Sequence, residues 1–197
     1  MVRMLIAAVL AGVVMFFWGY VSHAVLGIAD HTIKSIPDEA AVTAALRSGV
    51  REPGLYRYPG LPAGVRNDST VEITNGAILT AGDALTKRYE TEPHGLVLYN
   101  APSKQMTGGQ FGMQILSCTM CALVAAIMLA MANMRRFSAR FFFVALLGVF
   151  ATLAVNIPLW NWDGFPDDFT VGCAIDNIGA AVVAAFVLAA MLKPRAT

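Results

Sequence analysis

The side chains in this sequence best suited to chemistry are a histidine and an aspartate within long apolar segments. His23 lies in the first such segment and Asp176 in the last. Charged groups inside a membrane span are costly and usually face protein or water. Asp176 is spaced by four residues from Gly172 and Ala180, and Ala184 follows four residues later, so the acid lies on a helix face of small residues. Such faces pack against other helices in a membrane. We therefore expect His23 and Asp176 to pair, roughly 7–8 Å below the outer ends of their helices.

Two more polar side chains are predicted at a similar depth in the other apolar segments. Asn156 and Gln114 each share a helical face with small residues near the outer end. Together the four residues predict a bundle with one polar layer. This layer could hydrogen-bond the helices together, at less than about 1 kcal/mol per contact, or could bind a proton, a quinone or another ligand. A metal site is disfavoured because the three histidines show no clustering.

The cysteines allow a weaker, redox interpretation. Cys118 and Cys121 form a CxxC pair near the predicted outer end of the second segment, and Cys173 begins the fourth. A CxxC pair at a helix N-terminus can be redox-active because the helix dipole favours the thiolate. Cys118, however, lies about seven residues into the predicted span, where a thiol behaves as a small hydrophobic group. We expect these cysteines to pack rather than to react.

Four apolar segments must position these side chains, and each is long enough to cross a hydrocarbon core of about 30 Å as a helix. The first exceeds the apolar stretch of a signal peptide, so we expect an uncleaved helix. The predicted spans are Met4–Ile28, Phe111–Met134, Phe141–Trp160 and Val171–Leu192.

Charge is distributed unequally between the two ends of these segments. The six basic residues on one side have no acidic residue among them, and the short loop on the other side carries only aspartates. Cytoplasmic loops of membrane proteins are enriched in Lys and Arg, so both termini are predicted in the cytoplasm. The basic set is Arg3, Arg135, Arg136, Arg140, Lys193 and Arg195, and the acidic set is Asp163, Asp167 and Asp168.

The polar insert, residues 29–110, is then predicted outside. Helix signals mark Ser35–Val50 and Gly82–Thr91, and each is followed by Glu-Pro and then Gly-Leu-x-x-Tyr. This similarity favours pairing of Leu55–Tyr58 with Leu96–Tyr99 in a small sheet and leaves an internal duplication open. Residues 61–80 are expected to add a strand at Thr70–Thr74 and a turn at Asn75-Gly76.

Composition excludes some classes of function. Hydrophobic residues make up 57% of the 197, above the share in ordinary soluble domains. A net charge of +1 argues against nucleic-acid binding, which needs a basic patch. The sequence contains no Gly-rich phosphate loop, HExxH or serine nucleophile elbow.

Two resemblances bear on the class of protein. The run Trp18-Gly-Tyr-Val-Ser-His-Ala-Val-Leu-Gly27, with EPGLYRYPG and HGLVLYNAP downstream, resembles a group of bacterial inner-membrane proteins that have no assigned activity. This resemblance implies a bacterial inner membrane and no particular chemistry. The layout of four spans with a CxxC is similar to that of quinone-linked disulfide-generating membrane proteins. That class needs a second reactive cysteine pair, whereas only Cys173 remains here.

The sequence therefore predicts a mostly α membrane protein with four transmembrane helices and a small α/β periplasmic insert. The expected parts are a first helix (1–28), the insert (29–110) and the remaining helices (111–197). The favoured function is a non-catalytic accessory or assembly subunit of a larger membrane complex, such as a respiratory one, embedded in lipid. The alternatives are a redox or quinone-interacting enzyme using His23, Asp176 and the CxxC, and a homo-oligomeric channel or carrier. No cofactor is required, although a quinone or a lipid could bind.

Overall fold

The computed structural model describes residues 1–62, 64–72, 78–104 and 106–193. The chain divides into two compact units. The first joins Met1–Ser35 to Lys104–Thr197 and contains the long apolar helices, and the second, Ile36–Ser103, holds short helices and strands.

The helical unit is a bundle of long helices, two of which contain a π-helical segment. Its elements are α1 (Val2–Tyr20), η1 (Val21–Val25), α2 (Ile28–Thr32), α5 (Gly108–Ala132), α6 (Phe137–Ala151), η2 (Thr152–Asn156), α7 (Ile157–Asp163) and α8 (Asp167–Met191). The segment η1 continues α1, and η2 joins α6 to α7 in one continuous helix. Gly27, with a φ of +62°, breaks the chain direction between η1 and α2.

Four helices in the described part of the chain are long and apolar enough to cross a membrane, which confirms the prediction of four such segments. They run Val2–Val25, Gly108–Ala132, Phe137–Asp163 and Asp167–Met191. The fourth begins four residues earlier than predicted. Pro166 precedes its first turn, and Asp167 and Asp168 lie in that turn, where carboxylates interact favourably with the positive end of the helix dipole.

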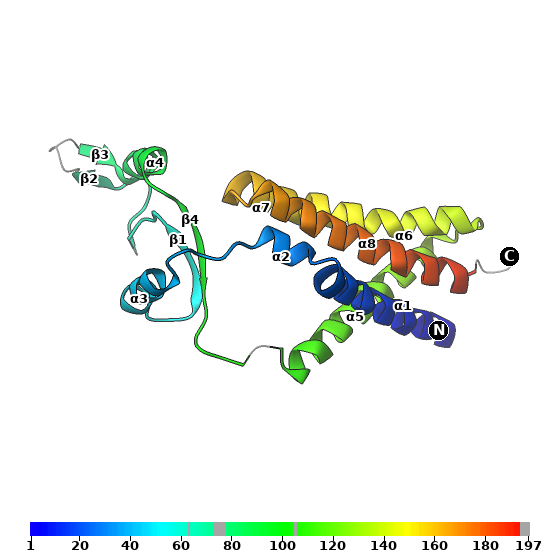
Figure 1. Ribbon diagram of the computed structural model, residues 1–197. Coiled ribbons are helices and arrows are strands. Elements are labelled where there is room, and N and C mark those ends of the chain that lie inside the picture. The colour runs from blue at the N-terminus through cyan, green and yellow to red at the C-terminus, as the bar shows by residue number, and fades with distance from the viewer. Residues whose placement is uncertain (63, 73–77, 105, 194–197) are drawn as a thin grey trace. The chain divides into compact units, whose positions relative to one another are not determined.

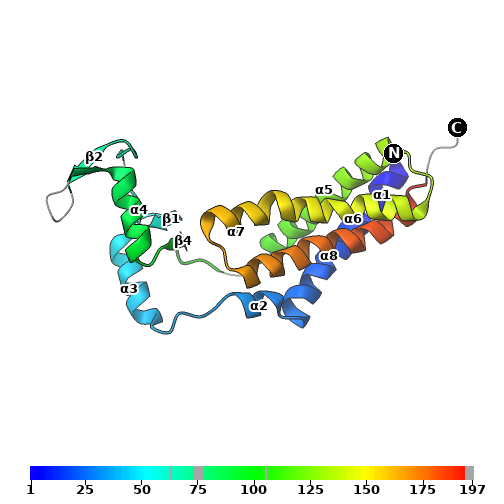
Figure 2. The ribbon, with the colours of Figure 1, turned by 90° about the horizontal axis from the view of Figure 1, so that it is seen from above.

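The bundle packs with α1 and α8 in the middle. The most extensive contacts are between α6 and α8, α1 and α5, and α1 and α8 (Figures 1 and 2). The buried cluster is rich in alanine, which lets helix backbones approach closely. Its members are Ala7, Ala8, Ala11, Ala122, Ala125, Ala126, Leu129, Val144, Ala184, Ala185 and Leu188.

Two glycines allow the closest approaches between these helices. A Cβ atom at Gly148 of α6 would lie 2.6 Å from the backbone oxygen of Asn177 in α8. A Cβ atom at Gly12 of α1 would lie 2.5 Å from the Cα of Thr119 in α5. Because real side chains do not tolerate such distances, glycine at these positions sets the spacing of α6 from α8 and of α1 from α5.

The α5–α6 turn is held to the end of α8 by a buried arginine. Arg140 donates through Nε and one terminal nitrogen to the Ala189 carbonyl, at 3.1 and 3.0 Å. Its other terminal nitrogen donates to the carbonyls of Met134 and Arg135, at 3.2 and 2.6 Å. The last carbonyls of a helix lack partners within it, so Arg140 caps the end of α8 and at the same time binds the turn that follows α5.

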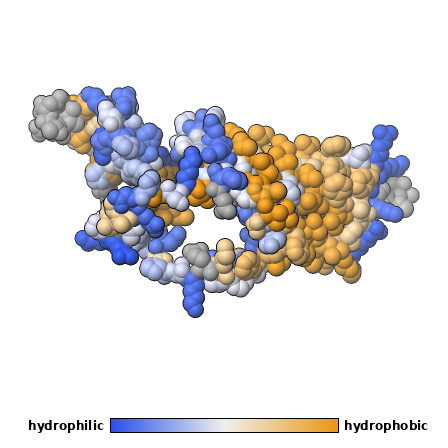
Figure 3. Space-filling model, in the orientation of Figure 1, coloured by the Kyte–Doolittle hydropathy of each residue, from blue (hydrophilic) through white to orange (hydrophobic). Residues whose placement is uncertain are grey.

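The outer surface of the bundle is apolar. Large hydrophobic side chains such as Leu5, Val124, Phe142, Leu153 and Phe186 are exposed along the four helices. Figure 3 shows a broad hydrophobic surface over the bundle on the face in view. Such a surface is unusual on a soluble monomer and fits contact with lipid or with another apolar protein surface.

The insert unit contains two helices and two small antiparallel sheets. Its elements are α3 (Glu39–Gly49), β1 (Gly54–Tyr58), β2 (Thr70–Glu72), β3 (Ile78–Thr80), α4 (Ala81–Thr91) and β4 (Gly95–Tyr99). The predicted pairing is present: β1 pairs with β4, with Leu55 opposite Leu98. The strand β2 pairs with β3, which the sequence analysis did not anticipate. The predicted turn at Asn75-Gly76, and the end of the expected strand, lie outside the described residues.

Local side-chain contacts account for the helix starts in the insert. Asp38 accepts from the backbone N–H of Ala41 at the start of α3, and Thr80 accepts from that of Asp83 at the start of α4. At the end of α4, Arg88 donates to Glu92 at 2.9 Å. This guanidinium holds the pKa of the Glu92 carboxyl below its usual value because it favours the charged form.

The insert has almost no core of its own. Among its described residues, only Pro59 and Ala81 are buried. Leu55, Leu98 and Ile78 are 66%, 71% and 70% exposed. A two-stranded sheet with so little covered apolar surface is marginal when alone in water. The insert therefore has the composition of a folded unit but lacks the burial that would stabilise one.

Candidate functional site

The predicted approach of His23 to Asp176 is present in the structure. His23 Nε2 lies 3.3 Å from Asp176 Oδ2, and this contact is a salt bridge when the imidazole is protonated. The other carboxylate oxygen, Oδ1, accepts a hydrogen bond from the hydroxyl of Ser22. Ser22 is fully buried, whereas the side chains of His23 and Asp176 are 55% and 25% exposed. The carboxylate thus faces η1, and the imidazole lies at the edge of the contact.

Consecutive residues of a π-helical segment contact the two oxygens of a single carboxylate. In an α-helix, neighbouring side chains point about 100° apart because there are 3.6 residues per turn. Ser22 and His23 lie in η1, where one extra residue widens the turn. Sequence reasoning assumed a regular helix and placed only His23 at this position. Ser22 was missed, and its adjacency to His23 was the available signal.

A second polar pair lies on the other side of α8. Asn177 Nδ2 donates to Asn156 Oδ1 at 2.8 Å. Asn156 is buried and ends η2, the second π-helical segment. The first residue of η2, Thr152, bonds through its hydroxyl to the Gly148 carbonyl at 2.9 Å. Asn177 was also missed, although its position directly after Asp176 marks it as a second polar residue at that level.

The indole of Trp18 packs on the same stretch of α8. A Cβ atom at Gly179 would overlap the Trp18 ring, so the indole can pack against α8 only because residue 179 is glycine. The Trp18 Nε1–H is buried, and the described residues offer it no acceptor. The pattern Trp18, Ser22 at i+4 spacing would have placed both residues on the face of α1 that packs against α8.

Gln114 and the cysteines form a separate group. Gln114 Nε2 donates to Cys118 Sγ at 3.7 Å, within α5. Cys118 is buried, Cys121 is exposed and Cys173 is partly buried, and all three are free thiols. The single polar layer expected from sequence is therefore divided into three groups of contacts. His23 and Asp176 belong to one, Asn156 to a second and Gln114 to a third.

Asp176 lies farther from the start of its helix than the sequence predicted. Because α8 begins at Asp167, Asp176 is nine residues from the helix start, or about 13 Å at 1.5 Å per residue. The short helix α2 packs along this first part of α8: a Cβ atom at Gly172 would lie 3.1 Å from Ile28 and 3.3 Å from Thr32. The helix α2 therefore covers part of α8 about one turn before Asp176.

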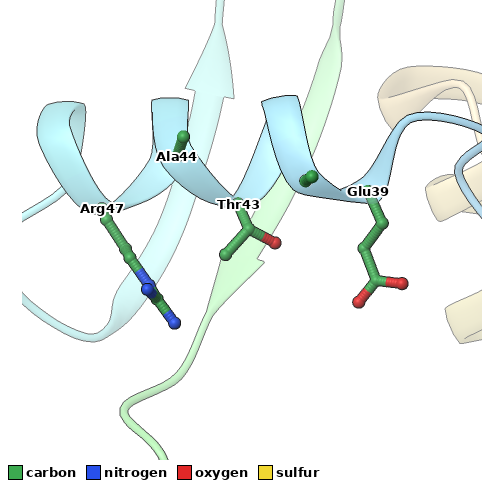
Figure 4. A pocket seen from close by; sticks show the side chains of 5 residues that line it. Glu39, Thr43, Ala44 and Arg47 are labelled. Atoms are coloured by element: carbon green, nitrogen blue, oxygen red, sulfur yellow. The ribbon is translucent and has the colours of Figure 1, made fainter.

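Other binding features are few. Within the described ranges, no group of three or more His, Cys, Asp or Glu side chains could hold a metal ion. A shallow depression of about 520 Å³ runs along α3 and is lined by Glu39, Ala40, Thr43, Ala44 and Arg47. Figure 4 shows Glu39, Thr43 and Arg47 extending to the same side of the helix. This depression is open and lies in the insert, apart from the polar residues of the bundle.

The arrangement around Asp176 suits helix attachment better than catalysis. Both carboxylate oxygens are engaged by side chains of η1, and the adjacent Asn177 engages η2. Each contact joins two helices, and none leaves a nucleophile facing an open cavity. Comparison of the chain with protein families, with curated proteins and with solved structures finds no match.

Proposed function

We propose that this protein is a non-catalytic subunit of a larger complex in a bacterial inner membrane, where it supports assembly or stability. In this proposal both termini are cytoplasmic and residues 29–110 are periplasmic. The support for the orientation is the charge distribution: six basic residues flank one end of the spans, without an acidic residue among them.

The observation that carries the proposal is the exposed apolar surface of the insert. Leu55 and Leu98 lie opposite each other in the β1–β4 pair and are mostly exposed, and only Pro59 and Ala81 are buried among the described insert residues. A unit of this size gains stability only by burying such side chains. A protein surface that covers them would complete the insert, which is the expected behaviour of a subunit.

The polar contacts of the bundle fit the same role. They join α8 to α1 and to η2, so they fix the helices rather than bind a substrate. His23 is half-exposed on the flank of a membrane-spanning helix, where a polar group needs protein or water as a neighbour. A neighbouring subunit over this position would supply that polar surface.

The proposal is tested by purifying the tagged chain from its native membrane in a mild detergent and identifying co-purifying chains by mass spectrometry. We expect at least one other membrane protein in constant stoichiometry. Leu55→Asn should reduce its recovery, and Glu90→Asn, an exposed control in α4, should not. Recovery of this chain alone, whether with bound quinone or as a pure homo-oligomer, would contradict the proposal.

The orientation is tested by cysteine labelling in a variant with all three native cysteines replaced by alanine. Lys87→Cys in the insert and Ser138→Cys at the start of α6 are both exposed positions. An impermeant maleimide added to intact spheroplasts should label the first and spare the second until the membrane is opened. Labelling of Ser138→Cys in intact spheroplasts would reverse the orientation.

A further inference from the structure

The strands β1 and β4 carry the same motif and pair with each other through it. Both read Gly-Leu-x-x-Tyr, as Gly54–Tyr58 and Gly95–Tyr99. In the antiparallel register, Gly54 lies opposite Tyr99 and Tyr58 lies opposite Gly95, with Leu55 opposite Leu98. The motif is therefore its own antiparallel complement, because glycine meets tyrosine at both ends.

Side-chain packing explains this pairing. A glycine in a strand leaves a gap that an opposite aromatic ring can cover. The Tyr58 ring covers Gly95 in this way: a Cβ atom at Gly95 would lie 3.2 Å from the Tyr58 hydroxyl oxygen. A Cβ atom at Gly54, which lies opposite Tyr99, would first meet the ring of Tyr56 in its own strand, at 3.3 Å. The fit of an opposite ring over a glycine is therefore present at the Gly95–Tyr58 pair, and replacement of either of these two residues would remove it.

The sheet that results is incomplete. Each of these strands has one partner strand among the described residues. Isolated two-stranded sheets are marginal, and a free edge of apolar residues is available for further pairing. The β4 strand contains no charged residue, whereas β1 carries Arg57. Both strands carry the motif, and of the two outer edges β4 is the one without a charged residue.

We propose that β4 pairs antiparallel with β4 of a second copy of this chain, centred on Val97. The register repeats the pairing already present between β1 and β4: Gly95 lies opposite Tyr99 of the second copy, and Leu96 lies opposite its Leu98. The two Val97 residues meet at a two-fold axis. The product is a four-stranded sheet in the order β1–β4–β4–β1, closed by symmetry and free of charged pairs at its centre.

A second copy is the occupant that the motif specifies. An isologous interface requires a surface that complements itself, and the β1–β4 pair demonstrates that Gly-Leu-x-x-Tyr does so. Pairing also doubles the apolar face that carries Leu55 and Leu98, giving other subunits a larger surface. The inference thus deepens the subunit role proposed above, although the pairing itself does not require another kind of chain.

The test is disulfide trapping of the full chain in detergent, with native cysteines replaced by alanine. Directly opposite Cα atoms in antiparallel strands are about 4.5–5.5 Å apart, within the range that a disulfide spans. Val97→Cys should form a covalent dimer under mild oxidation as the major species. Leu98→Cys, offset by two positions from its symmetry mate, should give little dimer. Tyr56→Cys, at the centre of β1, should give none above background.

The outcomes separate this inference from the proposed function. Dimer formation by Tyr56→Cys in place of Val97→Cys would overturn it, as would a failure of all three variants to cross-link. Light scattering on the unaltered chain provides a check that needs no substitution, and a mass of one copy would also overturn it. If the chain is monomeric yet co-purifies with another subunit, only this inference fails. If it dimerises through Val97 without other chains, only the proposed function fails.

Discussion

Asp176 and Asn177 are consecutive residues of α8, yet they bond to different helices. Asp176 accepts from Ser22 and contacts His23 in η1, and Asn177 donates to Asn156 in η2. Each partner lies in a π-helical segment, where the local widening of the helix moves side chains from their regular positions. One level of α8 therefore fixes two neighbouring helices, and both depend on an irregular turn for the contact.

The first prediction concerns the coupling of His23 to Asp176. Removing either side chain takes away the contact between His23 and Asp176 Oδ2, while Ser22 still bonds to Oδ1. This contact can be lost only once, so the double replacement should cost less than the sum of the single ones. We expect a coupling free energy of about 0.5–1.5 kcal/mol, the range found for polar contacts in membranes. The measurement is thermal unfolding in detergent of His23→Gln, Asp176→Asn and the double variant.

A matched cycle controls for general weakening of the bundle. The Ala189 carbonyl, to which Arg140 donates, lies thirteen residues from Asp176 along α8, or about 20 Å. His23→Gln and Arg140→Met should therefore add within about 0.5 kcal/mol. Additive losses in the His23–Asp176 cycle would mean that the 3.3 Å contact carries no coupling.

The second prediction concerns helix spacing at Gly148. Alanine normally favours a helix over glycine by about 0.5–1 kcal/mol. At Gly148 the added Cβ would lie 2.6 Å from the Asn177 carbonyl oxygen, and overpacking of this kind costs about 1–3 kcal/mol. The steric cost exceeds the helical gain, so Gly148→Ala should lower the unfolding temperature. Gly112→Ala in α5, where the new Cβ meets nothing within 4 Å, should leave it unchanged or raise it.

The third prediction concerns Arg140 at the other end of the bundle. Arg140→Met keeps the apolar stem but removes every donor to Ala189, Met134 and Arg135. Hydrogen bonds from a charged group contribute about 1.5–3 kcal/mol, so the variant should unfold at a clearly lower temperature. Arg140→Lys should rescue only part of the loss because an ammonium group cannot reach both the Ala189 carbonyl and the carbonyls of the turn.

The exposed neighbour Arg136 provides the control for charge alone. Arg136→Gln removes one positive charge from the same turn and should change stability by less than about 0.5 kcal/mol. Equal losses in Arg136→Gln and Arg140→Met would show that the net charge of the turn matters, rather than the capping of α8.

Hydropathy was sufficient to predict the four helices, because any chain that spans lipid needs a long apolar segment with its backbone bonded internally. The i+4 pattern of small residues was sufficient to predict that His23 and Asp176 approach each other. It did not lead to Ser22, which lies about 100° around a regular helix from His23, although the i+4 spacing from Trp18 indicates the face of Ser22. Asn156 was predicted as a polar residue of the bundle, but its partner Asn177 was not, although Asn177 directly follows Asp176.

The distance of Asp176 from the start of its helix was underestimated because hydropathy does not register a polar first turn. Asp167 and Asp168 belong to α8, although their charge placed them in the loop during sequence analysis. In the insert, the repeated Gly-Leu-x-x-Tyr motif was sufficient to predict the β1–β4 pair. A strand beginning at Thr70 was predicted and β2 begins there, but β3 was not predicted, because its three residues are too few to show a hydrophobic alternation.

The last prediction concerns the cysteines. Cys118 is buried in α5 beside Gln114, and Cys121 is exposed one turn further along the helix. If the thiols only pack, replacing both by alanine should leave the yield and the co-purifying chains unchanged. A membrane-permeable maleimide should label Cys121 several-fold faster than Cys118, because burial limits access to the Cys118 thiol. Equal labelling rates would contradict the packing of Cys118, and loss of a thiol-dependent activity in the double variant would restore the redox interpretation.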